Sequence, residues 1–400
     1  MPTFDLFSPE FKANPFPTFA QMRQTAPVFA HKMPNGEMAW YITRYDDVMA
    51  VLMDNDNFIK DHRRLEARSP ASNPGLQQLI NQNMLFSDPP DHTRLRALVN
   101  QAFTPRRMEQ MGPQMQSVAD SLVDRVAGRG TMDVMADVAL PFPVSVICDL
   151  LGIPRAEQDQ VADWSQAIIS PGRHRLSYGR RRKKVRAFVD YLRAMFADRR
   201  VHPRDDLVTA LVQAEQGGDT FTETELSSMV ALLLVTGHET TVNLIGNGVL
   251  ALLLHPEQLA RLKAEPDLLD KAIEELLRYD GPVETSTTRW ARRDVEFRGH
   301  LIKRGDIVRV VLTSANRDAA HFENPDQLDL SRVANKHLGF GHGIHYCLGA
   351  PLARLEGRIA LNTLLQRLPN LRLAVPVEQL RWRSGVLFRG LDQLTVIWDR

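Results

Sequence analysis

One cysteine in a glycine-rich segment is the residue of this chain best suited to chemistry. Cys347 lies in residues 338–349, LGFGHGIHYCLG, which hold four glycines. Glycine at this density lets the backbone turn tightly and lets a flat partner approach closely. The pattern after Cys347 predicts a helix that starts immediately there, and a helix N-terminus favours thiolate over thiol. A thiolate acts as a nucleophile or as a metal ligand.

The sequence around Cys347 and Cys148 limits what else the two cysteines can do. No second cysteine stands near Cys347, so a zinc or iron–sulfur cage is excluded. His342 and His345 fit hydrogen bonding to an anion as well as they fit ligation. A cysteine phosphatase needs an arginine after five intervening residues, whereas Arg354 follows after six. Cys148, in an apolar segment, is expected to be an inert core residue.

A long apolar helix with a polar centre is the second chemical feature. Thr222-Glu-Thr-Glu225 fits a capping box, and the apolar pattern then continues to His255, where Pro256 stops it. At 1.5 Å per residue such a helix is about 50 Å long. Its centre, TGHETT at 236–241, contains a glycine that costs about 1 kcal/mol relative to alanine. Residues that are unfavourable inside an apolar helix, such as this glycine and its polar neighbours, often mark a functional site.

Two more helices are predicted towards the C-terminus. Residues 268–279 carry Glu275 and Arg278 on one face, where an exposed pair contributes only a few tenths of a kcal/mol, about 0.3. The helix after Cys347 presents an apolar side formed by Leu348, Leu352, Leu355 and Ile359.

The composition predicts one helix-rich globular domain. The chain has 400 residues, is 44% hydrophobic and carries a net charge of +1, which gives no global attraction for nucleic acid. Two cysteines fit a reducing compartment. No repeat or linker divides the chain, so a single domain over 1–400 is expected. The fold class is mainly α with small β-sheets, and β-like patterns occur at 39–42, 295–302, 307–311 and 371–397.

No export or membrane-spanning signal is evident. The first ten residues carry acids where a signal peptide needs bases. The longest apolar runs, 229–235 and 249–254, fall short of the ~20 residues that cross a bilayer. A cytoplasmic protein without a transmembrane segment is therefore expected. The N-terminal phenylalanines, Phe4, Phe7, Phe11, Phe16 and Phe19, are expected to pack against the body of the protein.

The cysteine segment matches a known signature. Phe340, Gly343, Cys347 and Gly349 fit F-x-x-G-x-x-x-C-x-G, and His345 completes the form G-x-H-x-C. The segment therefore resembles the haem-ligand loop of soluble bacterial members of the cytochrome P-450 family.

Other motifs extend this resemblance over most of the chain, in the expected order. Glu275-Leu-Leu-Arg278 resembles the family's E-x-x-R, and residues 237–240, GHET, resemble its oxygen-activation motif. Residues 316–332 look like its meander, and residues 88–96 look like its haem-facing helix C.

The resemblance implies a cytochrome P-450 fold with haem between the long central helix and the helix after the cysteine loop. The cofactor is then haem b (iron protoporphyrin IX), with Cys347 as the axial thiolate ligand of the iron. The implied activity is that of a haem-thiolate monooxygenase, which inserts one atom of dioxygen into a lipophilic small molecule by hydroxylation or epoxidation.

Several residues match cofactor-binding positions of the family. Haem propionates are buried carboxylates that need cationic or hydrogen-bonding partners. The matching positions are His92, Arg96, Arg289 and His345, and Phe340 is placed at the cofactor by the same signature. Arg292 and Arg293 compete with Arg289 for this role.

The resemblance also assigns catalytic, substrate and structural positions. Thr240 would hold dioxygen and a water by hydrogen bonds, and Glu239 would relay protons from solvent. Thr236 stands where the family usually has alanine, and its hydroxyl would either bond back to the helix or narrow the pocket. The substrate-lining positions are Leu85, Phe86, Leu233, Thr236, Val283, Thr285 and Leu387. Glu275 and Arg278 are structural and tie their helix to the meander through Arg332.

Electrons must come from another protein, because no G-x-G-x-x-G fingerprint occurs in a strand–turn–helix context. A ferredoxin with its reductase, drawing on NAD(P)H, is the expected donor. Its docking on the cysteine side would use Arg94, Arg106 and Arg107. The protein is expected to be monomeric. A peroxide-driven peroxygenase and a non-catalytic haem sensor of the same fold are the alternatives.

Residues Arg173 to Arg186 form a basic run with eight Lys or Arg and no acid. A run of like charge is usually a solvated face. By resemblance this one lies in the lid over the substrate channel. The hypothesis is therefore that this run attracts an anionic substrate or an acidic carrier protein.

Overall fold

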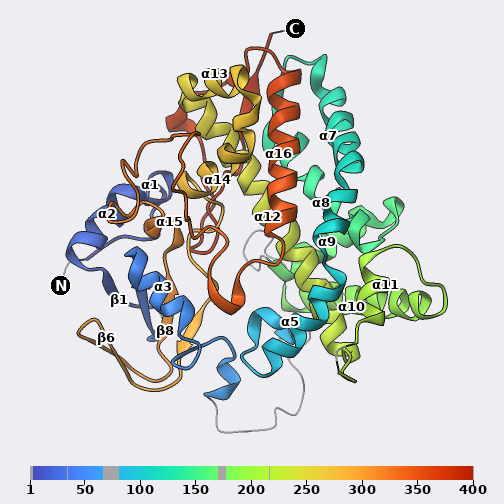
Figure 1. Ribbon diagram of the computed structural model, residues 1–400, viewed down its shortest axis with the longest axis vertical. Coiled ribbons are helices and arrows are strands. Elements are labelled where there is room, and N and C mark those ends of the chain that lie inside the picture. The colour runs from blue at the N-terminus through green and yellow to red at the C-terminus, as the bar shows by residue number, and fades with distance from the viewer. Residues whose placement is uncertain (1–2, 34, 66–80, 170–176, 216, 400) are drawn as a thin grey trace. The chain divides into compact units, whose positions relative to one another are not determined.

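The computed structural model describes residues 3–33, 35–65, 81–169, 177–215 and 217–399 (Figure 1). The chain divides into two compact units: the first holds residues 1–66, 114–141 and 240–400, and the second holds residues 67–113 and 142–239. Each unit is built from segments far apart in the sequence. A single domain over 1–400 remains a prediction.

A five-stranded sheet lies in the first unit. Its strand order is β1 (Val28–Lys32), β2 (Met38–Ile42), β8 (Ile307–Val310), β5 (Arg289–Ala291) and β3 (Phe58–Ile59). β2 and β8 run parallel, whereas the other neighbouring strands are antiparallel. The sheet therefore joins the N-terminal residues to residues near 300.

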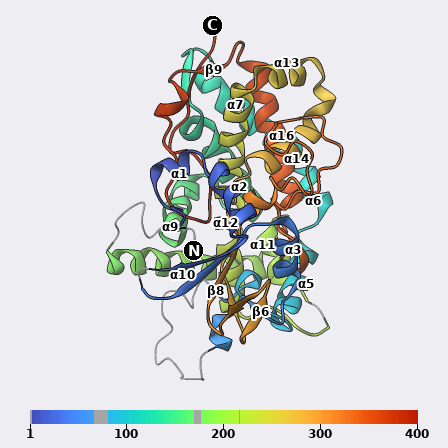
Figure 2. The same cartoon turned by 90° about the vertical axis from the view of Figure 1, so that its left-hand side faces the viewer.

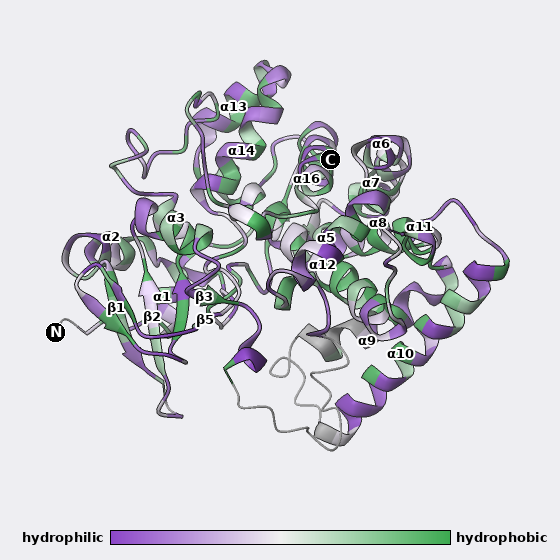
Figure 3. Cartoon of the chain, turned by 60° about the horizontal axis from the view of Figure 1, so that its bottom comes forward, coloured by the Kyte–Doolittle hydropathy of each residue, from purple (hydrophilic) through white to green (hydrophobic). Residues whose placement is uncertain are grey.

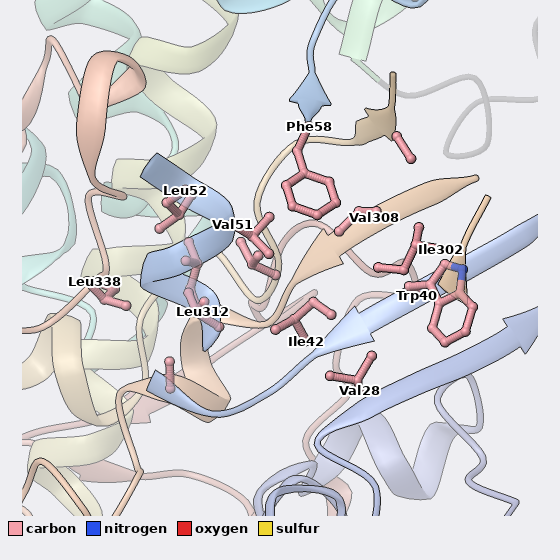
Figure 4. Close-up of a cluster of buried hydrophobic side chains, with 14 residues drawn as sticks. Val28, Trp40, Ile42, Val51, Leu52, Phe58, Ile302, Val308, Leu312 and Leu338 are labelled. Atoms are coloured by element: carbon pink, nitrogen blue, oxygen red, sulfur yellow. The ribbon is translucent and has the colours of Figure 1, made fainter. Parts of the chain in front are cut away.

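Successive side chains of β2 enter two different hydrophobic clusters, one on each face of the sheet. Trp40 and Ile42 enter a buried cluster with Val51 and Leu52 of α3 (Tyr45–Met53), as Figure 4 shows. The intervening Ala39 and Tyr41 enter a second cluster, which contains residues of the N-terminal helices. The period of two in the sequence thus directs successive residues to opposite faces.

Two smaller sheets complete the strands of the first unit. β4 (Thr131–Asp133), β10 (Thr395–Ile397) and β9 (Arg372–Leu373) form one, and β6 (Val295–Phe297) pairs with β7 (His300–Ile302) in a hairpin. All four predicted β-like regions contain strands. β1, β3, β4 and β5 lie outside the predicted regions.

The first unit also contains helices in its described part. They are α1 (Pro9–Ala13), α2 (Phe16–Thr25), α3, α7 (Gly112–Ala127), the second half of α12 (Glu223–Leu254), α13 (Pro256–Ala264), α14 (Leu269–Tyr279), α15 (Leu312–Ala315) and α16 (Ala350–Arg367). Short turns are η1 (His62–Arg64), η3 (Met135–Ala139), η5 (Pro266–Leu268), η6 (Gly343–His345) and η7 (Val377–Gln379).

α16 is flanked within this unit by α7 and α14 (Figures 1 and 2). Gln116 Nε2 donates a 2.9 Å hydrogen bond to Thr363 Oγ1, which joins α7 to α16. α14 buries Ala272, Ile273, Leu276 and Leu277, spaced as one helix face requires. The helix after the cysteine is thus held on two sides.

The second unit is helical in its described part. It contains η2 (Met84–Phe86), α5 (Asp91–Ala102), α6 (Pro105–Gln110), α8 (Pro141–Leu151), η4 (Arg155–Glu157), α9 (Gln158–Ile169), α10 (Tyr178–Val201), α11 (Leu207–Gln213) and the first half of α12. α9 lies beside α10 (Figures 2 and 3), where the ring of Trp164 contacts those of Phe188 and Tyr191. Arg199 of α10 bonds Asp206 at the start of α11 at 2.6 Å.

The capping box of the long helix is present as predicted. Glu225 N–H donates to Thr222 Oγ1 at 3.2 Å, and Thr222 N–H donates to Glu225 Oε2 at 2.9 Å. α12 then runs to Leu254, one residue short of the predicted end. By length and hydropathy this helix could span a membrane, but 72% of its most apolar window is buried inside the protein, as in the core helix of a globular protein.

The expectation for Cys148 is confirmed, and that for the N-terminal phenylalanines is confirmed except at Phe7. Cys148 is 0% exposed, and its burial raises the pKa of its thiol to about 12, so it is an inert core residue. Among the N-terminal phenylalanines, Phe11 and Phe19 are buried and in edge contact, and Phe4 packs against Phe29. Phe7 is 46% exposed and lies beside His31.

Candidate functional site

The cysteine loop of the first unit is closed by three backbone hydrogen bonds. Gly341 N–H donates to Leu338 O at 2.8 Å, Tyr346 N–H to Gly343 O at 3.0 Å and Cys347 N–H to Phe340 O at 3.0 Å. Gly341 and Gly343 adopt φ of +70° and +73°, which L side chains rarely adopt. A Cβ at 343 would lie 3.0 Å from Leu52 O. The loop thus requires glycine and presents Cys347 as an exposed side chain.

The helix after the cysteine starts later than predicted. α16 begins at Ala350 with Gly349 as its N-cap, so Cys347 stands two residues before the cap. The expectation of a helix starting directly after Cys347 is wrong, because the Cys347 N–H closes the loop and Pro351 occupies the first helical turn. The helix dipole falls off within its first turn, so it favours a thiolate less than expected.

An ion-paired cluster missed by the sequence analysis supports Phe340. Arg354 of α16 lies 4.5 Å from the Phe340 ring centroid and donates to both Glu274 oxygens, at 2.6 and 2.8 Å. His337 Nε2 is 3.1 Å from Glu274, and Gly339 N–H donates to His337 Nδ1. Burial acts to raise the pKa of Glu274, yet the bonds from Arg354 and His337 lower it to about 2. The cluster therefore fixes the loop to α14 and α16.

Glu275 and Arg278 form a buried pair, not an exposed one. Both side chains are 0% exposed, and Arg278 donates to the two Glu275 oxygens at 2.8 Å. Arg278 also donates to the carbonyls of Asn316, Pro325 and Gln327. Arg332 Nε bonds Glu275 at 3.1 Å, which is the contact expected from the resemblance. These bonds tie α14 to residues 316–332.

Asn316 extends this network to the cysteine loop. Its Oδ1 accepts a 2.7 Å bond from the N–H of Leu338, the first residue of the loop. A continuous set of bonds thus runs from α14 through Arg278 and Asn316 to the loop. Its partners lie 22 and 38 residues apart in sequence, which is why no local pattern could reveal it.

In the second unit, the first half of α12 contains Thr236 and Gly237 of the polar centre at 236–241, and contacts within this unit account for both residues. A Cβ at Gly237 would lie 3.0 Å from Ile147 Cδ1 of α8, so this glycine permits close helix packing. Thr236 is exposed and its hydroxyl donates to Leu232 O at 2.8 Å, so of the two predicted alternatives it bonds back to the helix. Glu239, at the end of this half, is partly exposed.

In the first unit, the second half of α12 begins with Thr240, which is partly buried. The next residue, Thr241, donates its hydroxyl to Glu356 Oε2 of α16 at 3.0 Å. Glu356 is fully buried, and this burial raises the pKa of its carboxyl to about 8 although the bond from Thr241 lowers it. Glu356 stands next to Leu355 on the apolar side of the helix predicted after Cys347, and this position was the signal in the sequence that could have indicated its burial.

The candidate propionate-binding residues divide between the units. In the second unit His92 and Arg96 lie one turn apart on α5; burial, and then the charge of Arg96, lower the pKa of the His92 imidazole. In the first unit Arg289 is only 2% exposed in β5, whereas Arg292 and Arg293 are exposed. Burial thus favours Arg289 over its two competitors. His345 lies in η6, partly buried.

Three of the candidate substrate-lining residues are brought together in the first unit. Val283 pairs with Phe388, Glu284 N–H donates to Leu387 O at 2.9 Å, and Thr285 Oγ1 donates to Val386 O at 2.8 Å. Lys12 holds this segment by a buried 2.7 Å ion pair with Glu284. Residues 283–285 and 386–388 therefore form one paired strip.

The remaining candidates of this group lie in the second unit. Leu85 and Phe86 form part of η2, partly buried, and Leu233 is buried in α12. Asn83, which caps η2, donates to Ser228 Oγ at 3.1 Å, so η2 is attached to the first half of α12.

Comparison with known proteins gives a consistent result over nearly the whole chain. The family model described as Cytochrome P-450 matches residues 6–371. The polyketide biosynthesis cytochrome P-450 PksS of Bacillus subtilis (strain 168) is 42% identical over 395 residues, which are 97% of this chain and 96% of that protein. The solved structure of PksS has a TM-score of 0.93 at 41% identity and covers 100% of both chains.

Two further solved structures carry ligands or partners in their descriptions. The myxobacterial cytochrome P-450 CYP267B1 in complex with myristic acid has a TM-score of 0.91 at 42% identity, over 99% of each chain. P-450 BioI in complex with an acyl carrier protein ligated to hexadec-9Z-enoic acid has a TM-score of 0.88 at 38% identity, over 98% of this chain and 99% of that one.

Proposed function

This chain belongs to the cytochrome P-450 family, and from that premise we propose that it is a ferredoxin-dependent monooxygenase that oxidises a lipophilic acyl-type substrate. Its fold, mainly α with small sheets, is that of the family, whose members are haem-dependent oxidoreductases acting on small molecules. The observation that carries the proposal is the cysteine loop, which presents one exposed thiol on a backbone whose positive φ angles at Gly341 and Gly343 favour glycine.

The residues present fit haem b, the cofactor of this family. Cys347 supplies a single thiol, and Arg289, His345, His92 and Arg96 are the proposed partners of the two propionates. A guanidinium as deeply buried as that of Arg289 suits a carboxylate partner. Haem b supplies an iron at which dioxygen is reduced, and thiolate ligation favours O–O cleavage. Phe340, clamped by Arg354, keeps the loop in place.

Thr240 and Glu239 are the proposed proton-handling residues. Glu239 is partly exposed and so exchanges protons with solvent at its carboxylate. The Thr240 hydroxyl, one residue along α12, holds a water by hydrogen bonds and passes its own proton on as it takes one up. Thr236 plays no part in this relay, since its hydroxyl is bonded to Leu232 O.

The electron donor is proposed to be a ferredoxin with its reductase. Of the three expected docking arginines, Arg94 is paired with Glu225 and Arg107 bonds Asp205 at 3.3 Å, both within the second unit. Arg106 is exposed and has no ion pair within the described residues, so its charge is available to an acidic partner. We place the protein in the cytoplasm, where such donors are found.

The substrate is proposed to be a long acyl chain, delivered either free or on an acyl carrier protein. PksS is named for polyketide biosynthesis, CYP267B1 was solved with myristic acid and P-450 BioI with an acyl-loaded carrier protein. The strip at 283–285 and 386–388 offers Val283, Thr285 and Leu387, and the second unit offers Leu85, Phe86 and Leu233. These apolar residues with few polar groups suit a chain of methylenes.

The reduced, carbon monoxide-bound absorption spectrum tests the haem-thiolate assignment. A Soret band shifted strongly to the red is expected for the protein and lost in Cys347→Ala. Turnover of myristic acid with ferredoxin, reductase, NADPH and isotopically labelled dioxygen should then place one labelled atom in the product. If labelled oxygen enters the product with hydrogen peroxide as the sole oxidant, a peroxygenase is favoured. If the substrate is not converted under any of these conditions, a haem sensor is favoured.

A further inference from the structure

The start of α10 carries a basic face in the second unit. Residues 180–186 contain six Lys or Arg and no acid, and Figure 3 shows the resulting hydrophilic stretch of this helix. Four of these cations are exposed: Arg180, Arg182, Lys183 and Arg186. We call these four residues the basic face. Arg173 and Arg175 of the same run lie outside the described residues.

The other two cations of the run attach α10 to α9. Arg181 Nε donates to Ala167 O at 2.8 Å, and Lys184 Nζ pairs with Asp163 at 2.6 Å. Within the part of the chain that the structure describes, no acid lies within ion-pair distance of the basic face. The opposite end of α10 differs, since Arg199 pairs with Asp206 and Arg200 with Glu223.

This arrangement is unfavourable for an isolated helix. Arg182 and Arg186 stand four apart and Lys183 and Arg186 three apart, so like charges are neighbours on the surface. Arg180 lies in the first turn of α10, where the helix dipole is positive and acids are preferred. In a chain with a net charge of +1, a local concentration of this kind indicates an anionic partner.

We propose that the basic face docks an acidic acyl carrier protein that presents the substrate chain. This inference rests on the proposed function, because it needs an acyl chain as substrate. A free fatty acid carries one carboxylate and would occupy one or two cations, whereas four cations along about 9 Å of helix match a row of acids on a protein surface. The unit that carries the basic face also contains the substrate-lining candidates Leu85, Phe86 and Leu233.

The test compares carrier-bound and free chains on the holoenzyme. Titrations with myristoyl-acyl carrier protein and with free myristic acid are followed by the change in haem spin state, at low and high salt. The variant Arg182→Glu/Lys183→Glu/Arg186→Glu reverses the basic face. Its matched control, Lys32→Glu/Lys263→Glu/Lys303→Glu, makes the same change in charge at exposed lysines elsewhere. The variant Arg182→Gln/Lys183→Gln/Arg186→Gln removes the same charges without reversing them, and it is used if the glutamate variant does not fold.

Reversal should weaken binding of the carrier-bound chain by about tenfold or more and leave free myristic acid within about twofold. High salt should no longer weaken carrier binding to this variant, because repulsion replaces attraction at the basic face. The control should bind both forms as the unaltered protein does. Equal binding of the carrier by the reversed variant would overturn the docking inference alone. An equal loss for free myristic acid would also overturn it, in favour of direct attraction of the anionic substrate. Absence of any response to either form would refute the acyl substrate and, with it, the inference.

Discussion

Thr241 and Glu356 are joined by a 3.0 Å hydrogen bond from the threonine hydroxyl to Oε2 of the carboxyl, between α12 and α16. Thr241 follows Thr240, and Glu356 lies on the helix that follows the cysteine loop. Glu356 Oε1 has no hydrogen-bond partner within the described residues. A carboxylate with so few donors is costly when buried, so the neutral acid is the favoured form.

Protein stability should therefore fall as the pH rises. Burial raises the pKa of Glu356 to about 8 in the folded state, from 4.5 in its ordinary setting. Between these values the folded protein binds a proton that the unfolded chain has released, so stability is full below the lower value and is lost as the pH approaches the upper one. The slope is about 1.4 kcal/mol per pH unit, or several kcal/mol in total.

Glu356→Gln should remove this slope, because glutamine keeps the shape and does not ionise. Denaturant unfolding of both proteins at about pH 5.5 and about pH 8 measures it. Glu257→Gln, at an exposed position of α13, is the control and should keep the slope of the unaltered protein. Parallel pH profiles for Glu356→Gln and the unaltered protein would contradict the assignment.

Arg278→Ala should destabilise the protein by about 3–5 kcal/mol. It removes the two-bond partner of Glu275 at 0% exposure and the donor to three backbone carbonyls, and leaves the buried carboxylate with Arg332 as its remaining ion-pair partner. Arg372→Ala breaks an ion pair with Asp399 whose side chains are 53% and 51% exposed, and should cost less than about 1 kcal/mol. Unfolding free energies of the two variants compare these costs. Similar losses in both would mean that burial of the first pair is unimportant.

The local parts of the fold were predictable from the sequence. The capping box of Thr222 and Glu225 is a four-residue pattern, and its two hydrogen bonds form as expected. The strand at 39–42 was visible because its residues are apolar and enclosed on both faces. The contacts of the capping box lie within four residues of sequence, and the strand is recognised from a short run of apolar residues, so neither depends on distant parts of the chain.

The cluster that supports the cysteine loop was not predictable in this way. Glu274 bonds Arg354 and His337, which are 80 and 63 residues away in sequence. The start of α16 was also misplaced, because the Cys347 N–H bonds backward to Phe340 O, a tertiary constraint that overrides the apolar period. Burial of Glu275 and Arg278 likewise depends on residues 316–332, so their spacing alone suggested an exposed pair.

Gly343→Ala should disturb the cysteine loop. The residue has a φ of +73°, and its new Cβ would lie 3.0 Å from Leu52 O, a backbone atom that cannot move freely. The positive φ alone costs about 1 kcal/mol. The fraction of protein with the red-shifted carbon monoxide band should fall. Gly112→Ala, where a Cβ meets nothing within 4 Å, is the control and should keep that fraction unchanged. A Gly343→Ala protein with an intact band would show that the loop tolerates the change.

Thr240→Ala should separate oxygen consumption from product formation. If the Thr240 hydroxyl passes protons from Glu239, its loss should lower product per NADPH by about tenfold or more while NADPH oxidation continues and hydrogen peroxide appears. Thr236→Ala is the matched control one helical turn earlier: its hydroxyl is bonded to Leu232 O, so its removal should leave the coupling ratio unchanged. Measuring product, peroxide and NADPH together distinguishes a proton-relay role from a simple loss of folded protein, because the latter lowers all three equally. A coupling ratio unaffected by Thr240→Ala, or lowered as much by Thr236→Ala, would remove Thr240 from the relay.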